Sequence, residues 1–221
     1  LVGSEMCIRD RVMTLILFNG CRQPVVPTEE DLAGYGWTLY KQGEYQEARE
    51  WFYDAVDKDS SFADGYNGIG WCFGKLRQAD SAAAYFHISQ TKPFDPYDTP
   101  DLDLDLYAGL TFAYSGMHID SLVRTYAAYV LAERPELGPW YFSHDQKINH
   151  LDVRLELALA DFNMGSFTSC RDNLQAIYND TYYQSFPANI IKALTMNVET
   201  LAGRAELAQT LQSLQQTLKN I

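Results

Sequence analysis

Apolar side chains recur at helical spacing in the second half of the chain. Between residues 148 and 162 they follow one another in steps of three and four, at Ile148, Leu151, Leu155, Ala158, Leu159 and Phe162. Near the C-terminus a second stripe, covered by glutamines on its other face, consists of Leu207, Leu211, Leu214 and Leu218. This spacing predicts two amphipathic helices. Residues 186–199 are ambiguous, and we expect one short helix there.

The middle of the chain repeats itself at an offset of 34 residues. Five identities carry the repeat: Gly36/Gly70, Trp37/Trp71, Lys41/Lys75, Ala48/Ala82 and Phe52/Phe86. Glycine and alanine allow two helices to approach closely, and a phenylalanine can fill the space toward the next unit. Gly43 suits the left-handed residue that ends a helix. The pattern therefore predicts units of two packed helices.

This period and pattern resemble the tetratricopeptide repeat, whose unit is two antiparallel helices. The resemblance is close over residues 29–96 and looser to about residue 180. It implies an all-α fold, a right-handed α-solenoid of antiparallel helix pairs with about four repeats. The leucine stripe at 207–218 then predicts a C-terminal capping helix, because a last repeat would otherwise expose its core. We place this helical domain at residues 29–221.

The first two repeats are predicted at 29–62 and 63–96. Thr28 suits the N-cap of the first helix, and the three acidic residues after it complement the helix dipole. Three prolines within residues 92–100 predict an inserted loop after the second repeat.

The third repeat is degenerate, with predicted helices at 106–115 and 119–133 and a turn at Gly116. A second insertion is expected at about 134–143, and a capping box starting at Ser143 is expected to begin the fourth repeat. In that repeat the turn, the small packing position and the large packing position are assigned to Gly165, Cys170 and Leu174.

The chain begins with a segment that we expect to lie outside the fold. Residues 12–18 are an apolar run, too short for the roughly twenty residues that span a bilayer but long enough for the core of a signal peptide. Gly20 and Cys21 follow, which resembles a bacterial lipobox and implies lipidation of Cys21. Phe18 departs from the leucine that is usual there, and a plain apolar segment is the alternative.

Upstream of this run, residues 1–11 look like a translated sequencing adapter, which would leave the signal-like segment 1–20 truncated at its start. The alternative is a short n-region in which Arg9 and Arg11 supply the positive charge. Residues 21–28, with two prolines and no helical period, are predicted to be a tether.

Composition and charge narrow the possible functions. The 221 residues are 47% hydrophobic and 14% aromatic, which excludes a disordered chain, and the formal charge of −12 disfavours a nucleic-acid partner. Four cysteines are no disulfide framework in a chain of this length. We expect Cys72 and Cys170 to be buried free thiols in different repeats, too far apart to bond.

No catalytic motif stands out, and we predict that the protein is not an enzyme and binds no cofactor and no metal. His144, Asp145, His150 and Asp152 cluster in the sequence, but we interpret them as a capped helix start. The alternating acidic run at 101–106 could be a cation site, although a solvated entry to a helix is the simpler reading.

The tetratricopeptide resemblance also implies which residues would line a ligand groove. The positions of the first helix that face this groove hold Trp37, Tyr40, Lys41, Asn67, Trp71 and Lys75. Family members that grip a C-terminal carboxylate use lysine and asparagine where this chain has Ala33 and Trp37, so that activity is not supported. Alternatively, the two indoles pack against the inserted loop around Phe94 and Tyr97 and close the groove.

Two functions remain open at this stage. The first is a non-catalytic scaffold that binds a protein or peptide in a bacterial cell-envelope complex, in the periplasm and anchored to the outer membrane through Cys21. The second is an accessory domain that holds a glycan or peptidoglycan strand against Trp37, Tyr40 and Trp71. The sequence indicates neither the partner nor an oligomeric state.

Overall fold

A computed structural model describes residues 26–97, 99–132, 138–180 and 194–219. In these ranges the regular structure is helical, with a single isolated β-bridge between Tyr141 and Asn149. The nine helices found there are α2 (Glu29–Gln42), α3 (Tyr45–Lys58), α4 (Ala63–Lys75), α5 (Ala79–Gln90), α6 (Leu102–Gly116), α7 (Asp120–Val130), α8 (His150–Asn163), α9 (Phe167–Tyr178) and α10 (Leu201–Lys219). The all-α prediction is confirmed.

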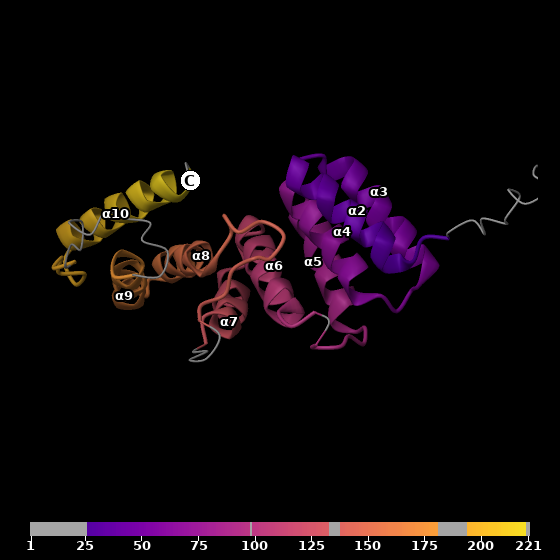
Figure 1. Ribbon diagram of the computed structural model, residues 1–221. Helices are drawn as coiled ribbons and strands as arrows, with labels where there is room; N and C mark the ends of the chain where they lie inside the picture. The colour runs from indigo at the N-terminus through magenta and orange to yellow at the C-terminus, as the bar shows by residue number, and fades with distance from the viewer. Residues whose placement is uncertain (1–25, 98, 133–137, 181–193, 220–221) are drawn as a thin grey trace, which may run out of the picture.

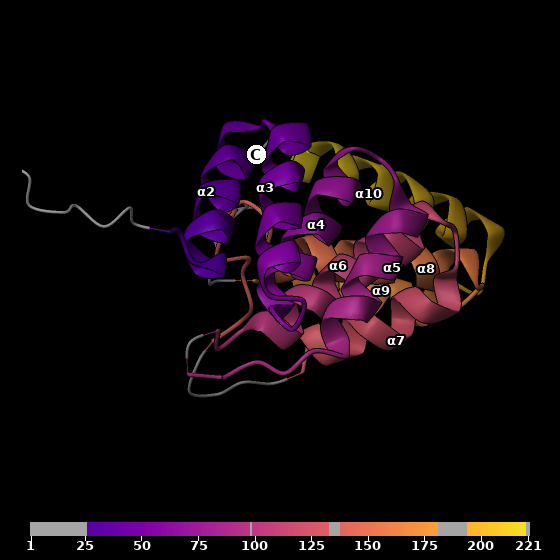
Figure 2. The ribbon, with the colours of Figure 1, turned by 90° about the vertical axis from the view of Figure 1, so that its right-hand side faces the viewer.

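Consecutive helices pack as pairs, and each pair packs on the next (Figure 1). The pairs are α2–α3, α4–α5, α6–α7 and α8–α9, and α3–α4, α5–α6 and α7–α8 join them. The first helices α2, α4, α6 and α8 also contact one another in succession, so they form a continuous surface that we call the first-helix face. Figure 2 views the molecule from the α2–α3 end, with α10 at the far end. There α10 packs on α8 and α9.

The turn inside each pair contains one left-handed residue. These residues are Gly43, Arg77, His118 and Gly165, with φ of 87°, 61°, 58° and 76°. They lie 34, 41 and 47 residues apart, so the second and third spacings exceed the period by 7 and 13 residues. The excess corresponds to the two insertions. The predicted turn at Gly116 is wrong by two residues, because Gly116 is the last residue of α6 and His118 takes the left-handed conformation.

Phenylalanine against glycine joins the pairs, as the repeat predicted. A Cβ added to Gly36 would lie 3.0 Å from Phe52, and one added to Gly68 in the next pair would lie 2.4 Å from the same ring. Phe86 makes the equivalent contacts with Gly70 and Gly109. Each ring therefore fills the space between its own pair and the following one. The small positions of the four pairs are fully buried at Ala48, Ala82, Val123 and Cys170.

Helix starts agree with the sequence at some places and differ at others. Thr28 caps α2 in a capping box with Asp31, as predicted. The box predicted at Ser143 is wrong, because α8 begins at His150 and is capped by Asn149. The acidic run is no loop either: α6 begins at Leu102, four residues before the predicted start.

The remaining predictions concern the core, the thiols and the ends of the chain. The leucine stripe is confirmed in α10, where Leu207, Leu211 and Leu214 are buried. Cys72 and Cys170 are buried free thiols. The helix expected at 186–199 is absent from 194–199, and the rest of it lies outside the described residues, as do residues 1–20 and Cys21. Among the helices that the structure describes, none is long and apolar enough to cross a membrane.

Candidate functional site

The loop at residues 138–149, which we call the covering loop, packs on the first-helix face. It contains most of the second predicted insertion. Trp140 and Phe142 are fully buried, and the Trp140 indole N–H donates to Oδ1 of Asp105 on α6 at 2.8 Å. The bridge between Tyr141 and Asn149 joins the two ends of the loop. These contacts hold the loop over α2, α4 and α6.

The two repeat-related tryptophans lie under this loop, each only 5% exposed. Trp37 stacks on His144, with ring centroids 3.6 Å apart and an angle of 6° between the planes. Trp71 stacks on Phe142 at 4.0 Å and 19°. The aromatic pair is thus covered by the second insertion. The first insertion, where we had considered such a contact at Phe94 and Tyr97, leaves Tyr97 95% exposed.

The other predicted groove residues divide between the interior and the surface. Tyr40 is buried, which raises its pKa well above the ordinary value, and its hydroxyl has no hydrogen-bond partner. Asn67 is also buried and donates to Oδ1 of Asp64 at 3.1 Å. Lys41 is exposed, whereas Lys75 forms an ion pair with Asp145 of the covering loop at 3.4 Å.

An acidic residue occupies the same position near the start of each first helix. The four residues share the spacing of the left-handed turns and are Glu30, Asp64, Asp105 and Asp152. The Trp37 indole N–H donates to Oδ2 of Asp64 at 2.8 Å, so the tryptophan of one pair bonds to the acid of the next. Trp71 would bond to Asp105 in the same way, but the covering loop supplies Trp140 to that carboxylate instead. The buried Trp71 indole N–H has no acceptor.

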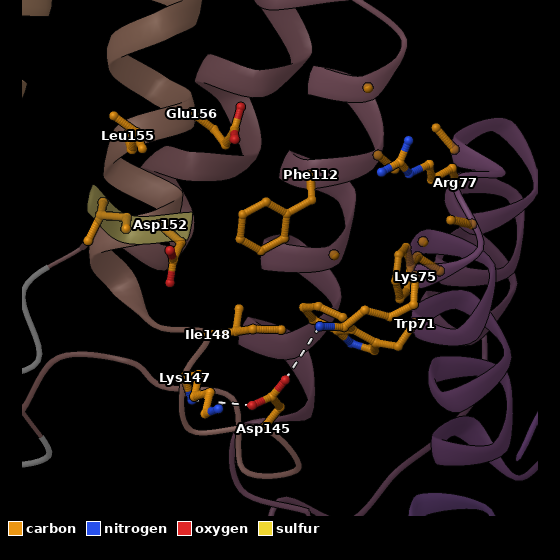
Figure 3. Close-up of a pocket in the computed structure, with 18 of the residues that line it drawn as sticks. Trp71, Lys75, Arg77, Phe112, Asp145, Lys147, Ile148, Asp152, Leu155 and Glu156 are labelled. Atoms are coloured by element: carbon orange, nitrogen blue, oxygen red, sulfur yellow. Dashed lines mark hydrogen bonds and ion pairs between the residues drawn. The ribbon is translucent and has the colours of Figure 1, made fainter. Parts of the chain in front are cut away.

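Beside the covering loop, a cavity of about 700 Å³ opens between α4, α5, α6, α8 and α10 (Figure 3). Its apolar lining includes Trp71, Phe86, Phe112, Ile148, Leu155 and Leu218. Its charged lining consists of Lys75, Arg77, Lys147, Asp145, Asp152 and Glu156. Figure 3 shows Trp71, Lys75 and Arg77 on one side, Asp152, Leu155 and Glu156 on the other, and Phe112 between them. The cavity is therefore apolar in the middle and charged on two opposite walls.

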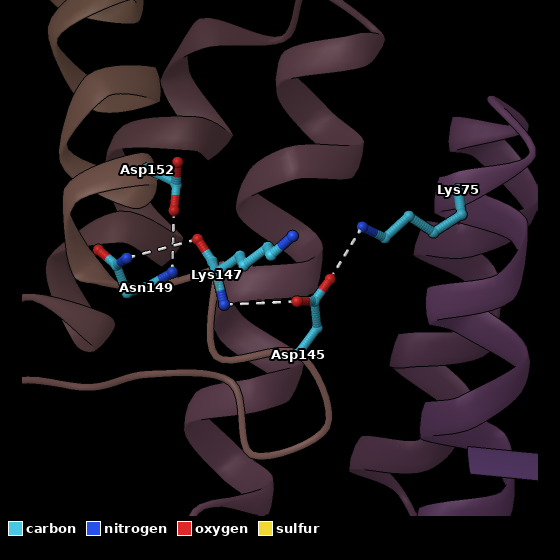
Figure 4. A network of polar contacts seen from close by, with 5 residues as sticks. All are labelled: Lys75, Asp145, Lys147, Asn149 and Asp152. Atoms are coloured by element: carbon cyan, nitrogen blue, oxygen red, sulfur yellow. Dashed lines mark hydrogen bonds and ion pairs between the residues drawn. The ribbon is translucent and has the colours of Figure 1, made fainter. Parts of the chain in front are cut away.

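A polar network holds the loop side of this cavity (Figure 4). Asp145 accepts from Lys75 Nζ at 3.4 Å and from the backbone N–H of Lys147 at 3.3 Å. Asp152 accepts from the backbone N–H of Asn149 at 2.9 Å. Burial, together with the neighbouring negative charge of Glu156, raises the pKa of Asp152 to about 6.

The titratable groups near the site are arranged for packing and recognition. Burial lowers the pKa of His144 to about 4, so this ring is neutral at physiological pH. Burial also raises the pKa of Cys72 and Cys170 to about 12, which makes them poor nucleophiles. His150 pairs with Asp180 at 2.9 Å. Across the described ranges, no three metal-ligating side chains come together.

Sequence reasoning missed the cavity, although one signal for it was present. Subtracting the seven extra residues of the first insertion places Phe112 at the position of Trp37 and Trp71. Phe112 is thus the next groove residue of the same series, and it lines the open part of the face. Comparisons of the chain with models of protein families, with curated proteins and with solved structures returned no match.

Proposed function

We propose that this protein is a non-catalytic binding protein that holds a segment of another polypeptide in the cavity beside the covering loop. One observation carries the proposal: the cavity of about 700 Å³ lies on the first-helix face, with an apolar centre and charged walls. This volume is within the range of sites that bury most of a ligand of modest size. A short peptide offers both apolar and charged groups to such a lining.

We also propose that the helix pairs are antiparallel and form the right-handed solenoid that the tetratricopeptide resemblance implies. The recurrence of the left-handed turn residue and of the phenylalanine–glycine contact supports equivalent pairs. The position of α10 against α8 and α9 supports its capping role.

A glycan strand is the weaker alternative. It depended on Trp37, Tyr40 and Trp71 as exposed stacking platforms, and all three are buried. A sugar would reach them only after the covering loop had left the face, whereas a peptide can enter the cavity with the loop in place.

The envelope location belongs to the same proposal and depends on Cys21. A lipid-anchored chain should take up palmitate and partition into detergent when it is expressed with a complete signal peptide, and Cys21→Ser should abolish both. A wild-type chain that remains in the aqueous phase would contradict the anchor while leaving the binding function open.

Two glycines provide a matched test of the cavity. Gly74 lines it, Gly34 lies exposed on α2, and a Cβ added to either meets nothing within 4 Å. Peptides would first be selected from a displayed random library on the full chain, and their affinities then measured by fluorescence anisotropy. Gly74→Leu should fill the cavity and weaken binding at least tenfold, because about 1.4 kcal/mol corresponds to that factor.

Gly34→Leu should bind the same peptides as the wild-type protein does. Equal affinity for both variants would place the binding site elsewhere. Failure to select any peptide would refute the proposed ligand class.

A further inference from the structure

The indole N–H of Trp71 is a donor in search of an acceptor. Trp71 is 5% exposed, lines the cavity, and has no hydrogen-bond partner. Leaving a buried donor unpaired costs about 1–3 kcal/mol, so native proteins seldom tolerate it without a reason. Its expected acceptor, Asp105, is occupied by Trp140. An acceptor atom entering the cavity would therefore remove a cost that the free protein bears.

Positive groups gather on the same side of the cavity. Figure 4 shows the Lys147 side chain extending toward the ammonium group of Lys75. Asp145 lies 3.4 Å from Lys75, longer than the 2.7–2.9 Å typical of a charge-assisted bond. Arg77 and Lys147 also line the cavity, and the structure gives neither side chain a partner among the described residues. Converging cations beside an unpaired N–H are typical of a site for an anion.

The negative groups of the cavity are already engaged. Asp152 accepts the backbone N–H of Asn149, and Glu156 accepts the hydroxyl of Ser115. Both lie on α8, on the wall opposite Lys75 and Arg77 (Figure 3). The free hydrogen-bonding capacity is thus greater for donors than for acceptors.

Resting on the peptide binding proposed above, we infer that the bound segment carries a carboxylate next to an apolar side chain. The carboxylate accepts from the Trp71 indole N–H and is neutralised by Lys147 and Arg77. The apolar side chain packs on Phe112, in the middle of the cavity. An Asp or Glu side chain and a C-terminal carboxylate supply the same chemistry.

The experiment compares peptides that differ only in this group. Peptides selected on the full chain would be made with amidated C-termini, each in an acidic form and in a form with Asn or Gln in place of Asp or Glu. The acidic form should bind at least tenfold more tightly, as expected for a hydrogen bond to a charged group. A third form with a free C-terminus shows whether the terminal carboxylate is the source.

Two lysine variants then locate the effect. Lys147 is exposed on the covering loop, so Lys147→Met should fold normally and reduce the preference for the acidic form to about threefold or less. Lys41 is exposed on α2 away from the cavity, and Lys41→Met should leave the preference intact. Trp71→Phe keeps a ring and removes the N–H, so it should also reduce the preference.

The outcomes separate this inference from the function beneath it. Peptides that lose binding in Gly74→Leu but show no preference for the acidic form, or that prefer Lys and Arg, would overturn the inference and leave peptide binding intact. An acidic preference that survives in Lys147→Met would also overturn it. If no peptide binds, the proposed function fails and the inference with it.

Discussion

Asp105 is a buried carboxylate that holds the covering loop through Trp140. Burial raises its pKa well above the ordinary value; the bond from Trp140 opposes that shift, and Asp64 and Asp101 add to it. Asp105→Asn keeps an acceptor for Trp140 and removes the charge, so the free energy of unfolding at neutral pH should be unchanged or higher. Asp105→Leu leaves the indole N–H unpaired and should cost about 1–3 kcal/mol in urea unfolding. Equal losses in both variants would show that the charge itself is required.

His144 predicts how stability depends on pH. Burial lowers its pKa from 6.5 to about 4, with Asp64 opposing and Lys41 assisting the shift. The folded state thus binds this proton less tightly than the unfolded chain does, so the contribution to stability is complete above pH 6.5 and is lost as the pH falls toward 4. His144→Phe keeps a ring against Trp37 but does not titrate. Its melting temperature should therefore fall less than that of the wild type between pH 7 and 4.5, and parallel curves would contradict this.

Among the helix pairs, the turns offer a comparison of opposite changes. His118 is exposed with φ of 58°, a conformation that costs a residue with a Cβ about 1–2 kcal/mol. His118→Gly should therefore raise the free energy of unfolding by up to about 1 kcal/mol. Gly165 has φ of 76° and space around it, so Gly165→Ala should lower stability by about 1 kcal/mol through backbone conformation alone. Chemical denaturation measures both, and a neutral Gly165→Ala would refute the role of this conformation.

Local sequence signals predicted the helix pairs well where no insertion intervened. The offset of 34 residues placed α2 to α5, because Gly36 and Phe52 record contacts that recur unchanged in the next pair. The start of α8 was misplaced because the segment at Ser143 satisfies a capping pattern, while its real conformation depends on Phe142 packing against Trp71. That contact joins residues far apart in the chain, which no local pattern encodes.

The candidate site was predicted only in part for the same reason. The positions that face the first-helix surface were identified, and Trp71 and Lys75 do line the cavity. The cavity itself depends on what covers that surface. The covering loop closes the α2 end, and Leu218 of α10 borders the open part together with Phe112. Burial by a remote segment turned expected contact residues such as Trp37 into core.

Across the whole molecule the core divides at α8. Val153 belongs to a cluster that extends back to α2, whereas Leu151, Leu155 and Ala158 belong to one shared with α9 and α10. Neighbouring units of this kind can open separately. Leu207 is fully buried in the second cluster, so Leu207→Ala should remove about 2–5 kcal/mol from it.

Hydrogen exchange measured by mass spectrometry would show where that loss is felt. Exchange should accelerate in α9 and α10 of the Leu207→Ala protein, while α4 and α5 remain as protected as in the wild type. Acceleration by the same factor in all helices would show that the described helices unfold as a single cooperative unit.

The spacing of the left-handed turn residues also indicates where the chain can be redesigned. All length beyond the period lies in the connections between pairs, while the first connection, between Lys58 and Ala63, has not been extended. Exposed backbone at Ser60 and Ser61 makes this connection a natural graft point. A foreign epitope spliced between these two serines should be displayed with both flanking pairs intact. Whole pairs could be exchanged as cassettes at the same junctions.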